Sequence, residues 1–376
     1  MNSIVYFYAY FTAEMILVYI NSYLPLYFSE LQVDTTQLSI IFFFSYLFLF
    51  SRVAISVYFD RKNAKRKPLI IFSSFGIILS FTLLILTLNL LFIFGIFLGF
   101  IFAFVSVITV GINKIMIIQS LDIKTKNKNA LLIQLGAING SLIPIILFLI
   151  NTNLSANWNQ FFIFGILLTT PILIFVFLLK DEDANYKFNS GNNQEFKNVK
   201  KSIVLMCIFL FLACSDRLFS FSIKPWIAFK SSITFFSLIW FVLTLIYVSG
   251  NFCGGIILKR VNRKHVLIIS TVLIGIILFF APFIDFFIFL IFYGLYFFIS
   301  GILLISLLSI MMELSQNKVF YYQLMALFSI AANVVFTPLG TYLFNHIDTE
   351  IIIMIAGILI MISTIPVCFI KENINE

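Results

Sequence analysis

Two short basic stretches occupy matching places in an otherwise apolar chain: Ser56-Val-Tyr-Phe-Asp-Arg-Lys-Asn-Ala-Lys-Arg-Lys67 and Gly255-Ile-Ile-Leu-Lys-Arg-Val-Asn-Arg-Lys264. Long apolar runs that are able to cross a bilayer flank each stretch, so each is interpreted as a tight turn between two membrane helices. Lys and Arg in short turns favour the cytoplasmic side of a membrane. The two stretches therefore predict a duplicated membrane protein whose copies share one orientation.

The composition supports a chain that lives in lipid. Of its 376 residues, 61% are hydrophobic and 11% are charged, whereas a soluble domain has about 25% charged residues. Twelve helices of about 20 residues would use nearly the whole length, which leaves no room for a soluble catalytic domain. The net charge of +8 comes from Lys and Arg in the predicted turns, so we expect a lipid bilayer and not nucleic acid as the partner. Four cysteines lie in apolar runs without CxxC spacing, so we expect no disulfide, metal or cofactor.

Apolar runs between polar breaks predict an all-α integral membrane protein with twelve transmembrane helices in two six-helix bundles. The segment 181–201 is rich in Asn, Asp, Glu and Lys and has no apolar period, so it is the expected cytoplasmic linker between bundles at 1–180 and 202–376. The first six spans are predicted at 4–29, 37–59, 68–88, 90–113, 130–151 and 158–180. The second six are predicted at 202–223, 233–258, 265–284, 286–312, 319–344 and 350–370.

The distribution of Lys and Arg predicts the orientation. If the N-terminus is cytoplasmic, the inner turns hold most cations, and the outer turns hold Lys224 and Lys230 as their only cations. This asymmetry predicts that both termini are cytoplasmic and that the chain is a multi-pass protein of the plasma membrane.

Marker residues recur at nearly constant offsets between the halves. By subtraction, Asp60 and Lys259 are 199 apart, as are Lys114 and Glu313. Pro25 and Pro225 are 200 apart, and the pattern Ala-x-Asn-x4-Pro that starts at residue 137 recurs 194 residues later. Several matches in the same order predict that the two bundles are pseudo-symmetric repeats.

The turn after the second span resembles the signature of the major facilitator superfamily, which reads roughly G-x-x-x-D-R-x-G-R-R. Asp60, Arg61 and a basic end are present, although Ser56 replaces the leading glycine; the second copy keeps Gly255 and Arg260. The resemblance covers essentially the whole chain. Within the superfamily, the first span is similar to those of the sugar and nucleoside proton symporters. The resemblance to the superfamily implies a secondary transporter that works as a monomer by alternating access.

Ionisable groups inside membrane helices are costly and usually functional. Glu14 shares a helical face with Tyr10 and Asn21, because steps of four and seven residues return to nearly the same angle. We therefore expect this face to line the substrate and proton path, with Glu14 carrying a proton. A structural carboxyl group, hydrogen-bonded to a neighbouring helix, is the alternative.

The seventh span carries Asp216 and Arg217, which we also assign to the path. Adjacent helix residues diverge by about 100°, so each is expected to need its own partner, and Glu14 with Arg217 is one candidate pair. The alternative places both residues at the outer interface, where an arginine snorkels.

A second group of charged residues is predicted to gate the inner face. Lys114 and Glu313 end the fourth and tenth spans, and the resemblance implies that these helices meet there, so the two could pair; an interfacial position for both is the alternative. The resemblance also gives gating weight to Asp60, Arg61 and Arg260. Topogenic charge explains the remaining Lys and Arg of the turns.

The leading hypothesis for function is proton-coupled symport of a small polar organic solute. Gly136-x3-Gly140 is similar to part of a drug-antiporter signature, so a drug or metabolite proton antiporter is an alternative. A polytopic membrane enzyme is the rival from another class, but it would need a reactive cluster, and His265 and His346 are isolated at opposite faces.

Overall fold

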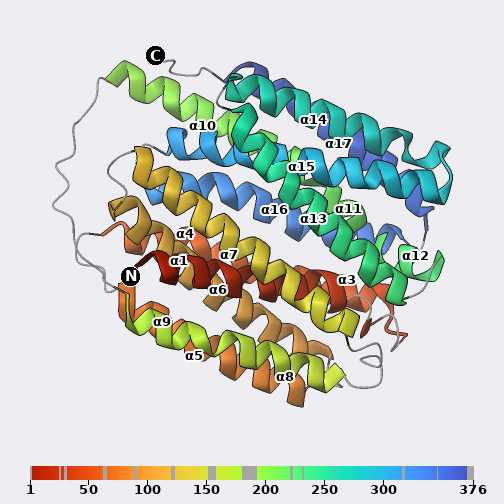
Figure 1. Ribbon diagram of the computed structural model, residues 1–376, viewed down its shortest axis with the longest axis horizontal. Helices are drawn as coiled ribbons and strands as arrows, with labels where there is room; N and C mark the ends of the chain where they lie inside the picture. Colours follow the sequence, from red (N-terminus) through yellow and green to blue (C-terminus); the bar gives the residue numbers. More distant parts are fainter. Residues whose placement is uncertain are drawn as a thin grey trace. The chain divides into compact units, whose positions relative to one another are not determined.

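The fold is described from a computed structural model (Figure 1). It describes residues 2–370 except 25–26, 29–31, 62–65, 88–90, 120–122, 151–157, 180–192, 221–222, 231–232, 259, 316–317 and 345. The chain divides into two compact units. The N-terminal unit comprises Met1–Tyr186 and Ile227–Phe241, and the C-terminal unit comprises Lys187–Trp226 and Val242–Glu376.

The N-terminal unit consists of helices that continue one another through short irregular turns. Its elements are α1 (Asn2–Val18), the π-helical η1 (Tyr19–Tyr23), α3 (Thr35–Leu47), the 3-10 turn η2 (Phe48–Phe50), α4 (Ser51–Phe59), α5 (Arg66–Leu86), α6 (Leu91–Gln119), α7 (Ile123–Ile150), α8 (Trp158–Thr169) and α9 (Pro171–Phe177). In span order, α1 with η1 forms the first, α3 to α4 the second, and α8 with α9 the sixth.

The C-terminal unit repeats this plan. Its elements are α10 (Asn193–Ala213), the 3-10 turn η4 (Cys214–Asp216), α11 (Arg217–Ser220), α12 (Ile223–Lys230), α13 (Ile233–Ile257), α14 (Arg263–Phe280), η5 (Ala281–Phe283), α15 (Phe286–Leu314), α16 (Val319–Leu343) and α17 (Thr349–Cys368). The first residues of α13, with part of α12, group with the N-terminal unit.

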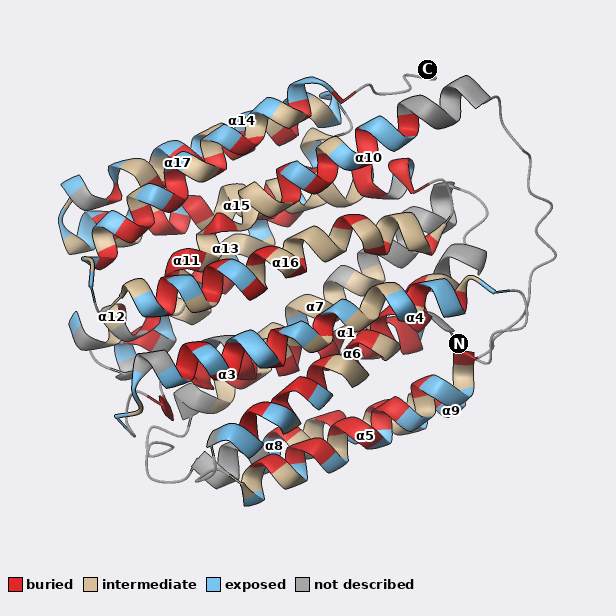
Figure 2. Ribbon diagram, turned by 180° about the vertical axis from the view of Figure 1, so that it is seen from behind, coloured by how far each residue is buried: buried red, intermediate tan, exposed pale blue. Residues whose placement is uncertain are grey.

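The helices have the length and apolar composition of membrane spans. Among the described residues, 9 helices are long and apolar enough to cross a membrane, and three shorter apolar helices, Ile4–Val18, Leu135–Leu147 and Ile163–Phe177, fall where the first, fifth and sixth spans were predicted. Exposed and buried residues alternate along α5 and α14 (Figure 2). The exposed ones include Phe72 and Leu86, which are 65% and 75% accessible. Such large apolar side chains lie outward because lipid, not water, surrounds them.

Helix pairing confirms the repeat that the offsets predicted. In the N-terminal unit α1 packs on α7, α3 and α4 pack on α6, and α5 packs on α6, α8 and α9. In the C-terminal unit α10 and α11 pack on α16, and α14 packs on α15 and α17. Gly250 and Gly301 bring α13 against α15. When the helices are numbered as spans, the N-terminal unit has the contacts 1–5, 2–4, 3–4 and 3–6. The C-terminal unit has the equivalent contacts 7–11, 8–10, 9–10 and 9–12.

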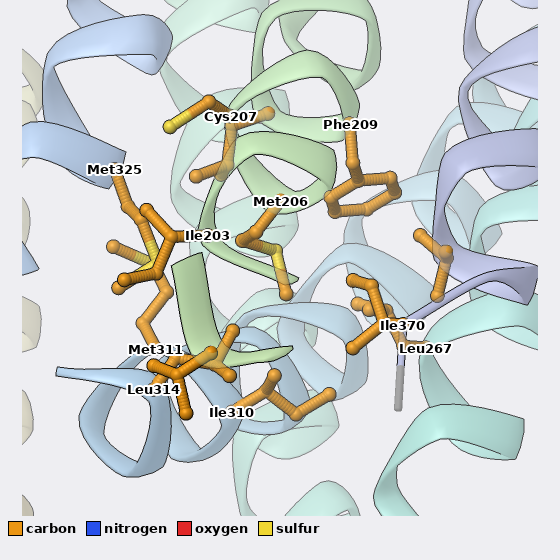
Figure 3. Packing of buried hydrophobic residues seen from close by; sticks show 13 residues of the cluster. Ile203, Met206, Cys207, Phe209, Leu267, Ile310, Met311, Leu314, Met325 and Ile370 are labelled. Carbon is orange, nitrogen blue, oxygen red and sulfur yellow. The ribbon is translucent and has the colours of Figure 1, made fainter. Parts of the chain in front are cut away.

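One apolar cluster lies in the core of the C-terminal unit (Figure 3). Met206 and Phe209 of α10 are fully buried there, and Leu267 of α14 and Met325 of α16 join them. Cys207 lies in the same cluster, and all four cysteines are free. With Ile310 of α15 and Val367 of α17, five helices bury their apolar faces in this cluster.

The structure differs from the predicted spans in two ways. Helix α10 begins at Asn193, inside the segment predicted as linker, because residues such as Glu195 and Lys197 are good helix formers even outside lipid. Several spans are also interrupted by a π-helical or 3-10 turn. Pro171 marks the break between α8 and α9, whereas the apolar runs gave no sign of η1 or η2.

Candidate functional site

The polar face of the first helix meets the fourth span. The Tyr10 hydroxyl donates a hydrogen bond of 2.5 Å to Oδ1 of Asn113 on α6, and Asn113 is buried. Glu14 lies one turn further along α1 and is half-buried. Asn21 falls in η1, and its side chain is outside the described residues. The structure thus brings Tyr10 to a polar partner that the sequence analysis missed.

The second span carries an arginine, Arg52, just after the irregular turn η2. Arg52 of α4 donates through Nε to the Ser106 hydroxyl at 3.1 Å, and Ser106 is fully buried on α6. Ser106 itself donates to the Phe102 carbonyl one turn back, at 2.7 Å. The side chain of Arg52 is therefore held within the N-terminal unit, so Arg52 joins the candidate polar residues of that unit.

The break in the seventh span is a polar junction of three consecutive residues. Cys214 Sγ lies 3.2 Å from the Ser329 hydroxyl on α16, and the Ser215 hydroxyl donates to the Ala356 carbonyl on α17 at 3.1 Å. Oδ2 of Asp216 accepts a hydrogen bond of 2.9 Å from the Tyr296 hydroxyl on α15. Asp216, Tyr296 and Arg217 form what we call the polar cluster. The turn η4 is thereby tied to three different helices of its unit.

Arg217 lies directly after this junction. Its Nε is 3.9 Å from Oδ1 of Asp216, with 38% of the arginine side chain exposed. We had expected adjacent residues to diverge, but the long arginine side chain folds back toward its neighbour. The pairing of Arg217 with Glu14 concerns two different units and stays a prediction.

Lys224 lies on α12, beyond the candidate span Val199–Ser220. Its side chain is buried. Burial, and after it the positive charge of Arg217, lower the pKa of Lys224 from 10.5 to about 7. Desolvation and a nearby like charge both disfavour the protonated amine.

Aromatic side chains of α15 line the helix beside the polar cluster. The rings of Tyr293 and Tyr296 stack with an interplanar angle of 3° and a centroid distance of 5.4 Å, and Tyr293 also stacks on Phe289. Trp226 meets Phe289 edge to face. This ladder fixes the position of the Tyr296 hydroxyl that holds Asp216.

The residues predicted to gate the inner face have partners inside their own units. Lys114 Nζ on α6 forms an ion pair with Oδ1 of Asp60, the residue that ends α4. Glu313 on α15 accepts a hydrogen bond of 3.0 Å from Nη1 of Arg263 on α14. Arg61 and Arg260 are exposed. Their gating role, and that of Lys114 with Glu313, stays a prediction.

A lysine at the end of each basic turn contacts the C-terminal end of another helix in its own unit. Lys67 Nζ donates to the Phe177 carbonyl at the end of α9 at 2.7 Å. Lys264 Nζ donates to the carbonyls of Cys368 and Ile370 at the end of α17, each at 2.8 Å. A cation there satisfies carbonyls without an intrahelical partner and the negative end of the helix dipole. These lysines, which we had read only as topogenic, cap helices.

Comparison with known proteins shows which fold this arrangement of helices has. The sequence matches no family model and no curated protein. Solved structures match over nearly the whole chain. The D-xylose-proton symporter aligns with a TM-score of 0.78 and 11% identity, over 98% of this chain and 97% of that one. The E. coli fucose:proton symporter aligns with a TM-score of 0.65 and 14% identity, over 98% of both chains. The chain has the major facilitator fold.

A human organic anion transporter shares this fold, with a TM-score of 0.67 and 10% identity over 97% of this chain and 98% of that one. In the major facilitator fold, polar residues of the two units lie on equivalent helices. Glu14 lies on the first helix of one unit, and Asp216 lies on the seventh, its repeat partner. Each unit also has an arginine well inside a candidate span, Arg52 in one and Arg217 in the other.

Proposed function

We propose that this protein is a secondary active transporter that moves a small polar organic solute across the plasma membrane by alternating access, coupled to proton symport. The observation that carries the proposal is the major facilitator fold with a carboxylic acid on the first helix of each unit. An acid within a lipid-embedded helix is costly, so its presence favours a role in transport.

Glu14 is the proposed proton carrier. It lies one turn from the hydrogen bond between Tyr10 and Asn113, in a helix whose neighbouring residues Ala13 and Met15 are buried. A carboxyl group in such surroundings changes protonation when its environment changes between the two access states. Tyr10 is proposed as the residue that keeps this face of α1 on α6, and Asn21 as a further residue of the path.

The proposed topology places both termini in the cytoplasm. The basic turns after α4 and α13 then lie on the inner side, in agreement with the Lys and Arg asymmetry of the sequence. We propose that the protein works as a monomer. Asp60, Arg61, Lys114, Glu313 and Arg260 are proposed to act at this inner face during gating.

The decisive experiment is uptake into proteoliposomes under an imposed pH gradient. Pooled labelled sugars, nucleosides, amino acids and organic acids are offered with the outer solution acidic. Symport predicts accumulation that collapses when a protonophore removes the gradient. Glu14→Gln should abolish accumulation and leave exchange of solute between the two sides intact.

Asp34→Asn is the matched control, because Asp34 is an exposed acid of the same unit whose side chain makes no capping hydrogen bond. It should accumulate solute like the wild type. Unchanged accumulation by Glu14→Gln would exclude Glu14 as the proton carrier. Accumulation only with an acidic interior would indicate antiport, and absence of movement for every solute would contradict transport.

The antiporter alternative is motivated by two glycines that also have a packing role. Gly136 and Gly140, which suggested it, let α7 approach the backbone of α1, where a Cβ atom would overlap the carbonyl oxygens of Phe7 and Phe11. Close helix packing therefore explains both glycines. The solved structures with this fold named above are transporters, which supports transport over membrane-enzyme activity.

A further inference from the structure

We propose that Arg52 is a positioning residue for the proton carrier: its guanidinium group faces the carboxyl group of Glu14 beside α6 and balances the charge that remains when the proton leaves. This inference rests on the proposed function and adds a residue to the proton path. It is carried by the contacts that α1 and α4 each make with α6, all within the N-terminal unit.

One face of α6 carries three buried polar side chains, those of Ser106, Thr109 and Asn113. Steps of three and four residues place them on the same side of the helix, and we call them the α6 stripe. Arg52 of α4 donates to Ser106 at 3.1 Å. Tyr10 of α1 donates to Asn113 at 2.5 Å. The α6 stripe therefore joins the polar face of α1 to the arginine of α4.

The direction of α1 relative to α6 follows from the packing of α7. Gly136 of α7 approaches the carbonyl of Phe7, and Gly140 approaches that of Phe11. The residue numbers rise together, so α7 runs parallel to α1. Consecutive membrane spans cross in opposite directions, so α6 runs antiparallel to α7 and therefore to α1.

This direction places Glu14 beside Arg52. Tyr10 and Asn113 lie at one level, and each residue advances a helix by about 1.5 Å. Glu14 follows Tyr10 by one turn on the same face, so it lies about 6 Å further along. Ser106 precedes Asn113 by two turns, so it and the guanidinium group of Arg52 lie about 10 Å along in the same direction. Glutamate and arginine side chains can span the remaining 4 to 5 Å or so.

The chemistry of the step needs a cation at this place. When Glu14 releases its proton, the O–H bond breaks, the proton passes to water and the electron pair stays on the carboxylate. A negative charge within a lipid-embedded helix is costly, and a neighbouring positive charge favours it. The hydrogen bond to Ser106 holds Arg52 in place while Glu14 is neutral. Arg52 thus sets the pH range over which Glu14 releases its proton.

Other titratable groups near α1 are further away or already paired. The elements that pack on α1 are η1, α6, α7, α8 and α9. Lys114 of α6 is paired with Asp60, and the hydroxyls of η1 belong to tyrosines, which are neutral near pH 7. The lysines of α7 precede Gly136 by eight residues or more, which places them about 20 Å or more from the level of Glu14. The sequences of α8 and α9 contain no titratable residue.

The first test follows the protonation of Glu14 directly. Infrared difference spectra of the purified full chain are recorded over a pH series, and the carboxylic-acid C=O band that Glu14→Gln removes is assigned to Glu14. In Arg52→Gln the midpoint of this band should rise by about 1 to 3 pH units, since no nearby cation then favours the carboxylate. Arg52→Lys should restore most of the wild-type midpoint.

Two further variants separate the charge of Arg52 from its anchor. Ser106→Ala keeps the arginine but removes its hydrogen-bond partner, so the midpoint should rise by less than in Arg52→Gln. Lys230→Gln is the control, because it removes an exposed cation of the same unit, and its midpoint should equal that of the wild type.

A double-mutant cycle distinguishes pairing from a merely structural contact of Arg52 with Ser106. Arg52→Gln should lower the melting temperature, because the Glu14 carboxylate then lacks a balancing charge. Adding Glu14→Gln should recover part of this loss, whereas independent residues give losses that add. Size-exclusion profiles identify a variant that fails to fold. If Arg52→Gln fails, the midpoint of Ser106→Ala decides, and an unchanged value there would overturn the pair.

The outcomes separate this inference from the proposed function. Uptake driven by a pH gradient, with equal midpoints in the wild type and Arg52→Gln, would overturn the pair and leave symport standing. A raised midpoint in Arg52→Gln, without transport of any solute, would support the pair and contradict the transporter. Additive losses of melting temperature, or the absence of any band that Glu14→Gln removes, would also overturn the pair.

Discussion

Lys114 near the C-terminal end of α6 donates to Asp60, which directly follows α4, so the ion pair joins the second and fourth spans of the N-terminal unit. Its counterpart has the opposite polarity. Glu313, 199 residues after Lys114 by subtraction, accepts from Arg263 at the start of α14. The repeat thus conserves the position of a charge on the fourth helix of each unit but reverses its sign and changes its partner.

Breaking the first pair should cost more than breaking the second. The side chains of Lys114 and Asp60 are only 13% and 23% exposed, against 47% and 44% for Arg263 and Glu313. Lys114→Met should therefore lower stability by about 1 to 3 kcal/mol, since it leaves a largely buried carboxylate without its partner. Glu313→Gln should cost about 0 to 1 kcal/mol, as exposed pairs do. Thermal unfolding of the purified protein measures both.

A charge exchange tests whether the pairing is direct. The double variant Asp60→Lys with Lys114→Asp should recover most of the stability that either single reversal loses. Exchanging Lys114 with Glu313 should give no such recovery, because each has a partner in its own unit. Recovery in the second exchange would favour the pairing across units that the sequence suggested.

Capping lysines should stabilise the end of the last helix in each unit. Lys67→Met and Lys264→Met each remove a hydrogen bond to a helix-terminal carbonyl, which should cost about 1 kcal/mol. Lys→Arg at either position should retain most of the effect. Hydrogen exchange at the ends of α9 and α17 provides the local readout, and unchanged protection there in both Met variants would contradict the cap.

Glycines at close helix contacts should tolerate no side chain. Gly136→Val and Gly140→Val place atoms against the backbone of α1, so each should destabilise the N-terminal unit by about 1 to 3 kcal/mol or prevent folding. Gly255→Ala is the contrast, since nothing lies within 4 Å of its Cβ position. The yield of monodisperse protein and its melting temperature measure the difference. A destabilised Gly255→Ala together with an unaffected Gly136→Val would refute this account.

Lys224 should make the stability of the protein depend on pH. Its pKa is about 7 in the folded protein, below the usual 10.5, so between these two values the unfolded chain binds the proton more strongly than the folded chain. The free energy of unfolding should therefore rise between about pH 7 and pH 10, and Lys224→Met should remove most of this rise. Denaturant unfolding at several pH values measures the effect, and an equal rise in Lys224→Met would contradict it.

The sequence anticipated the candidate site only in part. Glu14, Asp216 and Arg217 stand out because charge is rare in an apolar run, and that rarity needs no structure to be seen. Arg52 is also a charge inside an apolar run, but its partner Ser106 is one hydroxyl among many. Lys224 was read as a cation of an outer turn, because burial of a residue between two spans leaves no mark in the sequence.

Apolar run lengths, the basic turns and the offsets of about 199 residues were enough to predict two like-oriented sets of six helices, because lipid requires every span to be long, apolar and helical. Which side chains meet was decided only by the tertiary structure. Lys114 and Asp60 are 54 residues apart, and Lys264 is 104 residues from Cys368. Such contacts depend on how far each helix is rotated and shifted against its neighbours, and helical periodicity fixes a residue's angle on its own helix but not the position of the helix that it faces.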